Sequence, residues 1–159
     1  MRHRKLNRLN GFDYSKDNTY FITSCVQNKY PLLGKIIGEE MQLNELGKII
    51  ERQWYWLEEQ YSYVKLHAFV VMPDHIHGLI EIDRNLKIEE NQKIKSISQL
   101  IGAFKTNSSK EIHLKWDESF AWQRSFHDRI VRDENEYQRI FKYIVENPIK
   151  WAQNIQENM

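Results

Sequence analysis

The spacing of apolar positions changes several times along the chain, and each spacing predicts a different element. The segments 19–27, 63–72 and 75–83 are dense in β-branched and aromatic residues, which favour extended strands. Over 42–61 the apolar residues are instead three or four positions apart, which predicts an amphipathic helix. Its apolar face is interpreted as core and consists of Leu43, Leu46, Ile50, Trp54, Leu57 and Tyr61.

A hairpin is predicted in the centre of the chain. The dipeptide Pro73-Asp74 favours a tight reversal, so the strands on either side of it should pair in antiparallel fashion. The segment 29–41 contains a proline and two glycines, and the segment 84–95 is polar with mixed charge. Both segments are therefore predicted to be loops.

Two further elements follow this hairpin. An apolar face predicts a helix over 96–112, with Ser96 or Ser98 as its N-cap. Residues 120–132 interleave charged with apolar side chains, which indicates another strand.

The last predicted helix covers 133–147 and has clear boundary signals. Asp133 and Glu136 fit a capping box at its start, and Pro148 is expected to end it. The resulting order is β-α-β-β-α-β followed by one more helix. This is the order of an α+β ferredoxin-like fold, an antiparallel sheet with helices mainly on one face and the other face open to a ligand.

Composition and charge narrow the class of protein. The chain has 159 residues, 41% of them hydrophobic, which suits a single domain over 1–159. Net charge is only +1, but the arm at 1–10 contains four cations and no acid: Arg2, Arg4, Lys5 and Arg8. Such an arm can neutralise phosphates or be merely a solvated terminus. The single Cys25 excludes an intramolecular disulfide, and no apolar run reaches the ~20 residues of a membrane span, so we expect a soluble cytoplasmic protein.

Two histidines lie in the otherwise apolar stretch 70–82. Residues two apart on a strand point to the same side, so His75 and His77 share one face, and Ile76 and Ile80 point towards the helices. Two neutral imidazoles at this separation can hold one metal ion and leave coordination positions open. Taken alone, a short H-x-H pattern is more often a pair of hydrogen-bonded histidines on a half-exposed strand.

The last predicted helix adds two polar side chains. Its apolar stripe is Tyr137, Ile140, Phe141 and Ile144. Tyr143 lies roughly 110° from the centre of this stripe on the helical wheel, and Asn147 follows one turn later on the same flank. Each is unremarkable by itself. A phenol and an amide on one edge, combined with the H-x-H strand, form a combination that chance explains poorly.

These segments together resemble a known family. The sequences MPDHIH and WQRSFHDRIVRDENEYQRIFKYIVENPIKW are similar to those of the IS200-type HUH tyrosine transposases, and most of all to the REP-associated branch. The likeness extends from residue 20 to residue 148. It implies the ferredoxin-like fold, with the histidines at the centre of the sheet.

The resemblance also implies roles for individual residues. His75 and His77 would bind a divalent ion, Mg²⁺ or Mn²⁺, and Asn147 would complete the metal site where IS200-type enzymes often have glutamine. Tyr143 would be the nucleophile that forms a 5′-phosphotyrosine bond with single-stranded DNA and releases a 3′-OH. We expect a DNA partner, single-stranded or hairpin as in REP elements, no membrane partner, and a location at the bacterial nucleoid.

Further residues are candidates for DNA contact. Trp122 is expected either to stack on unpaired bases or to lie in the core, and Phe126 to lie in the core. Cations that are candidates for contact with phosphates are Arg124, Arg129, Arg132 and Lys105, together with the basic arm.

Alternative functions stay open at this point. One is a regulator that binds DNA hairpins but no longer cleaves them, and another is a zinc hydrolase that is indifferent to Tyr143. His67 is a possible extra ligand, although a core histidine is the simpler interpretation. Both a monomer and a homodimer fit the family, with the tyrosine reaching the histidines of its own chain or those of a partner.

Overall fold

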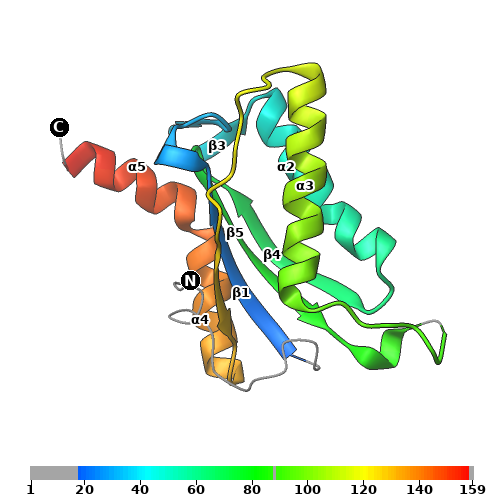
Figure 1. Ribbon diagram of the computed structural model, residues 1–159. Helices are drawn as coiled ribbons and strands as arrows, with labels where there is room; N and C mark the ends of the chain where they lie inside the picture. Colours follow the sequence, from blue (N-terminus) through cyan, green and yellow to red (C-terminus); the bar gives the residue numbers. More distant parts are fainter. Residues whose placement is uncertain (1–17, 88, 158–159) are drawn as a thin grey trace.

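The structure is a computed structural model that describes residues 18–87 and 89–157. Its centre is a four-stranded antiparallel sheet in the spatial order β4-β5-β1-β6 (Figure 1). The strands are β1 (Asn18–Cys25), β4 (Val64–Val71), β5 (His75–Ile82) and β6 (His127–Ile130). Strands β1 and β5 form the middle of the sheet, and both of their neighbours pair with them antiparallel. The predicted ferredoxin-like fold is therefore confirmed.

The helices divide between the two faces of this sheet. Helices α2 (Glu45–Gln60) and α3 (Ile97–Lys115) pack together on one face, whereas α4 (Glu134–Val145) lies on the other and contacts β4 and β5 (Figure 1). Helix α5 (Asn147–Glu157) follows α4 and contacts the small hairpin near the start of the chain. The face that carries the histidines is thus partly covered by α4. Among the helices of residues 18–87 and 89–157, none is long and apolar enough to cross a membrane.

The helix starts follow from local capping chemistry. The Asn44 side chain accepts a hydrogen bond from the Gly47 N–H at the start of α2. Helix α3 begins with a capping box between Ser96 and Gln99, so Ser96 rather than Ser98 is the cap. Asp133 caps α4 by accepting from the N–H of the third helical residue. The predicted starts of α3 and α4 are accurate because these signals act over one turn. The helix predicted over 42–61 starts too early, since Glu40–Leu43 is a strand and α2 begins at Glu45, so Leu43 is not on the helix.

The predicted loop over 29–41 is wrong in part. Residues Gly34–Ile37 and Glu40–Leu43 form a separate two-stranded hairpin, β2 and β3. The glycines that indicated a loop occupy its two special positions. Gly38 has φ +64° at the turn, and Gly34 has φ +143° with no room for a Cβ, which would lie 2.1 Å from the carbonyl oxygen of Gln42.

Two predicted boundaries in the second half also need correction. Of the strand predicted over 120–132, only β6 is in the sheet, and the preceding residues form an extended segment joined to Val26 by an isolated bridge at Trp122. The predicted helix over 133–147 ends earlier, at Val145, and Pro148 stands at the start of α5 rather than at an end. Proline is tolerated there because the first turn of a helix does not need its N–H.

Strand β5 is held against the helical layer by one close approach. Trp54 of α2 is fully buried, stacks on Phe69 with ring centroids 4.8 Å apart, and meets Phe104 edge-on at 5.3 Å. Its ring lies over Gly78, where a Cβ would come within 2.5 Å of the indole. The missing side chain of Gly78 therefore lets α2 sit directly on the strand that carries the two histidines.

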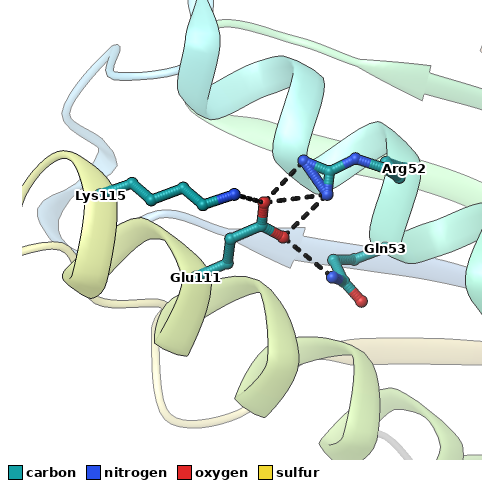
Figure 2. Close-up of polar contacts among 4 residues, drawn as sticks. All are labelled: Arg52, Gln53, Glu111 and Lys115. Atoms are coloured by element: carbon teal, nitrogen blue, oxygen red, sulfur yellow. Dashed lines mark hydrogen bonds and ion pairs between the residues drawn. The ribbon is translucent and has the colours of Figure 1, made fainter.

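A polar cluster joins α2 to α3 at the rim of this layer (Figure 2). Both Glu111 carboxylate oxygens accept from the Arg52 guanidinium at 2.7–2.9 Å, and Gln53 and Lys115 donate to the same carboxylate. The Glu111 side chain is 15% exposed, whereas Arg52 is 57% exposed. Burial alone would raise the pKa of Glu111, but the donors Lys115, Gln53 and Arg52 together lower it below its usual value.

Replacing Glu111 with Gln should lower the free energy of unfolding by about 1 kcal/mol at pH 7, because one charge-assisted acceptor is lost at a partly exposed site. A carboxylate with a lowered pKa stabilises the fold above its unfolded pKa of about 4.3 and loses this effect as the pH falls. Urea denaturation should therefore show a difference from the original protein at pH 7 that shrinks below about pH 4.

The matched control is Glu45→Gln, which removes a pair with Lys48 in which both side chains are more than half exposed. This control should change stability by no more than a few tenths of a kcal/mol. Equal losses in the two variants, or a Glu111→Gln loss independent of pH, would contradict the stabilising role of the cluster.

Candidate active site

The pairing of β1 with β5 brings four polar side chains to the α4 face of the sheet. Thr23 stands opposite His77, and Cys25 stands opposite His75. Side chains at alternate positions of a strand share a face, so all four project in one direction. The structure thus places His75 and His77 together on the face away from α2 and α3, as the sequence predicts.

A cavity of about 280 Å³ opens at this point of the sheet. Strands β1 and β5 supply its base, α4 one wall, and α5 and the loop after β1 the remainder. The lining residues are Thr23, Cys25, Lys29, Asp74, His75, His77, Tyr143 and Trp151. Both predicted histidines and the predicted tyrosine therefore meet in one cavity of a single chain.

Each histidine has a polar partner on its Nδ1 atom. The Nδ1 of His77 lies 2.8 Å from the Thr23 hydroxyl oxygen, and that of His75 lies 2.6 Å from a carboxylate oxygen of Asp74. The two rings are 4.7 Å apart between centroids. Partners of this kind orient imidazoles that bind metal through Nε2. The histidine pair therefore fits a divalent ion.

The electrostatics of the cavity favour neutral donors. Burial, and secondly the neighbouring His75, lower the pKa of His77 to about 3, so its imidazole is uncharged at neutral pH. Burial raises the pKa of the Cys25 thiol, which keeps it protonated. Within the described ranges, no group of three or more His, Cys, Asp or Glu side chains is arranged to hold a metal ion. A third protein ligand would have to be of another type.

Tyr143 stands beside the histidines at the edge of α4. Its ring centroid is 5.3 Å from that of His77 in the same chain, and it meets Phe21 edge-on at 6.2 Å. The side chain is 42% exposed, so the phenol is accessible from solvent. The prediction that Tyr143 lies on the flank of its helix rather than in the core is consistent with this exposure.

Helix α4 is fixed to the sheet by a second histidine network. His67 of β4 places Nδ1 2.8 Å from the Tyr137 hydroxyl and Nε2 2.9 Å from Glu81. A carboxylate only accepts, so the Nε2–H of His67 donates to Glu81. In the neutral imidazole Nδ1 is then the acceptor, and the Tyr137 hydroxyl donates to it. Burial, and secondly the nearby acids, raise the pKa of Tyr137, so its phenol stays protonated and can act as a hydrogen-bond donor. His67 is thus an anchor for α4, and both of its nitrogens are occupied.

Asn147, the predicted third ligand, is 8% exposed at the start of α5. Its side-chain nitrogen lies 3.5 Å from the carbonyl oxygen of Tyr143, a weak contact. It is not among the residues that line the cavity. Its role as a metal ligand stays a prediction.

The predicted DNA-contacting residues are distributed over two regions. Lys105 and Arg124 line a groove of about 580 Å³ between α3 and the segment before β6, where Lys105 donates to the Gln123 carbonyl at 2.6 Å. Trp122 also borders this groove, but it is only 7% exposed and its indole N–H donates to Ser108 at 3.0 Å. The structure therefore corrects the stacking interpretation and places Trp122 in the core.

The remaining candidates lie near α4 or outside the described part. Phe126 is in the core, as expected, with 6% exposure. Arg129 and Arg132 are exposed next to the start of α4, and Arg129 pairs with Glu136 at 2.5 Å. The four cations of the basic arm, Arg2, Arg4, Lys5 and Arg8, fall within residues 1–17, outside the described residues.

Several cavity residues escaped the sequence prediction. Thr23 and Cys25 carry no local signal, because only the strand register brings them to the histidines. Trp151 lies on a helix that the sequence analysis did not predict, with its ring 6.2 Å from that of His75. Lys29 has φ 54°, an uncommon backbone conformation for a residue with a side chain. Asp74 is the exception, since a carboxylate directly before a candidate metal-binding histidine is a recognisable orienting partner.

Comparison with known protein families gives one match. Residues 18–147 match the family described as "Transposase IS200 like". A protein of Haemophilus influenzae without assigned function is 36% identical over 165 residues, covering 96% of this chain and 92% of its own. Another from the same organism, named "Putative REP-associated tyrosine transposase", is 26% identical over 144 residues, covering 87% of this chain and 74% of its own.

Solved structures share the fold. A REP-associated tyrosine transposase bound to a REP hairpin superposes with a TM-score of 0.63 and 20% identity, over 90% of this chain and 73% of that one. A structure titled as a "putative transposase" from Deinococcus radiodurans R1 gives a TM-score of 0.52 and 17% identity, over 89% and 96% of the two chains. At these identities the likeness establishes the fold alone.

Replacing Tyr137 with Phe should loosen α4, because the hydroxyl that anchors it to His67 is removed. One hydrogen bond contributes about 1 kcal/mol, so amide protection in α4 should fall roughly fivefold in hydrogen exchange. The amides of β1 and β5 should keep their protection.

Tyr55→Phe is the matched control for this change. Tyr55 is 47% exposed on α2, on the opposite face of the sheet, and its replacement should leave the exchange of α4 unchanged. If the amides of α4 exchange at the same rate in Tyr137→Phe and Tyr55→Phe, the His67–Tyr137 contact does not anchor the helix.

Proposed function

This chain belongs to the IS200-like transposase family, and we propose that it cuts and rejoins single-stranded DNA with Tyr143 as the nucleophile. One observation carries the proposal. The exposed Tyr143 phenol lies in the same cavity as the two histidines, with its ring 5.3 Å from His77. A nucleophile and a pair of metal-binding groups at one surface cavity suit attack on a phosphodiester.

In the cleavage step, the Tyr143 oxygen attacks the scissile phosphorus in line with the departing 3′ oxygen. An O–P bond forms to tyrosine and the P–O3′ bond breaks. The proton lost by the phenol is balanced by the proton gained by the departing 3′ oxygen, which becomes a 3′-OH. Rejoining is the reverse, in which a 3′-OH attacks the 5′-phosphotyrosine and the phenol leaves. Because each step exchanges one phosphoester bond for another, the bond energy is retained and no external energy source is required.

We assign the metal to His75 and His77, with Asn147 as a third candidate, and expect Mg²⁺ or Mn²⁺. Such an ion supplies Lewis acidity to the non-bridging phosphate oxygens. The protein's own groups prepare the site for it. Thr23 and Asp74 hold the two Nδ1 atoms, and the low pKa of His77 keeps its ring neutral, so no proton has to leave that ring first.

The proposed substrate is a DNA hairpin with a single-stranded foot. The REP-associated tyrosine transposase that shares this fold is described as bound to a REP hairpin, which supports a hairpin substrate here. Lys29 borders the cavity and supplies a cation for the strand. The Tyr143 ring lies 5.3 Å from His77 of its own chain, which supports a monomer that acts in cis. A substrate of this kind places the proposed activity at the bacterial nucleoid. The alternative is a regulator that binds hairpins without cleaving them, and detection of covalent protein–DNA adducts distinguishes the two.

Replacing Tyr143 with Phe should abolish covalent protein–DNA adducts, because the attacking oxygen is removed while the ring is kept. The substrate is a library of labelled hairpins with randomised single-stranded feet, incubated with Mn²⁺, and adducts are detected by denaturing electrophoresis. Binding to the same library should persist.

Tyr55→Phe serves again as the control and should form adducts at the original rate. If the unaltered protein forms no adduct with any member of the library, the enzyme proposal fails and the regulator remains. Adducts that persist in Tyr143→Phe would assign the nucleophile to another residue.

Replacing Thr23 with Val should weaken Mn²⁺ binding by roughly ten- to a hundredfold, because valine keeps the shape of threonine but cannot orient the His77 ring. His77→Ala should abolish binding at this site. Calorimetry or Mn²⁺ electron paramagnetic resonance on the DNA-free protein measures both.

Thr19→Val, at the other end of β1, is the matched control and should bind Mn²⁺ like the original protein. If both Thr23→Val and His77→Ala bind Mn²⁺ with unchanged affinity, the metal does not bind in this cavity.

A further inference from the structure

A second cleft opens on the other side of Tyr143. It has a volume of about 290 Å³ and lies between α4 and the outer part of β1 and β6. Its lining residues are Phe21, Arg129, Glu136, Arg139, Ile140 and Tyr143. Tyr143 lines both this cleft and the histidine cavity. A DNA strand whose phosphate lies in the histidine cavity beside the Tyr143 phenol would therefore continue into this cleft.

The charges of the cleft suit one phosphate. Arg129 and Arg139 are 61% and 68% exposed, and both approach the same Glu136 oxygen, at 2.5 Å and 3.6 Å. Burial alone would raise the pKa of Glu136, but the Arg132 backbone N–H and the arginines lower it, so it stays ionised. Two cations and one anion leave one positive charge, with guanidinium groups still open to solvent.

The floor of the cleft is apolar and aromatic. Phe21 lies directly opposite Arg129 in the β1–β6 register. Its ring stacks on His77 with centroids 5.4 Å apart at 30°, so it sits between the histidines and the arginines. Ile140 of α4 faces the same cleft. An unpaired base can lie on such a surface, because every base presents a π-face whatever its identity.

We propose that this cleft binds the nucleotide adjacent to the scissile phosphate, with its base against Phe21 and Ile140 and its phosphate on Arg139 and Arg129. The inference rests on the proposed function, since it assigns the path of the DNA strand through that site. In this role Phe21 is a positioning residue: it sets where along the strand the Tyr143 oxygen meets phosphorus. Arg139 stands one helical turn before Tyr143 on the same edge of α4, so the two act on neighbouring groups of one strand.

Binding tests this assignment without requiring cleavage. In a Tyr143→Phe background, affinity for the hairpin library is measured by fluorescence anisotropy over a range of salt concentrations. Adding Arg139→Gln should weaken binding several-fold and reduce the salt slope by about 0.7, the value for one phosphate contact on a single strand. Lys142→Gln, on the same helix but outside the cleft, should change neither.

Base recognition is tested with Phe21→Leu, which keeps apolar bulk but removes the aromatic face. An abasic site next to the cut should weaken binding of the background protein roughly tenfold, and should weaken binding of the Phe21→Leu variant much less. An abasic site several positions away should affect both proteins equally.

The two proposals fail separately. Equal affinity and salt slope for Arg139→Gln and Lys142→Gln, or equal abasic effects with and without Phe21, would overturn the cleft as a subsite even if the unaltered protein forms adducts. Absence of adducts from the unaltered protein would overturn the cleavage proposal and leave the binding result to decide the cleft.

Discussion

The pairing register between β1 and β5 is the constraint on which the rest of the site depends. It places Thr23 opposite His77 and Cys25 opposite His75, so that one histidine is oriented by a neighbouring strand. Because side chains alternate between faces, a slip of β5 by one residue against β1 would turn both histidines into the helical layer and away from Thr23 and Cys25. Gly78 and Trp54 oppose such a slip, since the indole fits only where a strand residue has no side chain.

The second requirement is that α4 lies on the open face without closing it. A short amphipathic helix can bury only one stripe, and here the polar His67–Tyr137 contact supplements the apolar packing. The anchor is six residues before Tyr143, so the phenol is held at the edge of the helix rather than under it. The exposure of Tyr143 and the burial of His77 thus arise from the same docking geometry.

The predictable part of this structure is the part that local chemistry determines. Caps at Ser96 and Asp133 act within one turn, and strand alternation acts within a few residues, so the main elements and the face of the histidines follow from sequence. Trp122 was ambiguous because its burial depends on Phe104 and Ser108 of helix α3, contacts that no local signal in the sequence indicates. Trp151 and Thr23 were missed for the same reason, since their places depend on contacts between distant segments.

Charge shows why total composition is a poor guide to the partner of this chain. The formal net charge of +1 gives no preference for DNA. Some charged side chains bind one another within the protein, as Glu111 binds Arg52 and so joins α3 to α2. Around Tyr143 the balance differs. Glu136 is nearly buried and satisfied by hydrogen bonds, whereas the arginines that it holds remain more than half exposed. A buried acid that orients two exposed cations produces a local positive surface without raising the net charge, because it limits the directions in which the guanidinium groups point.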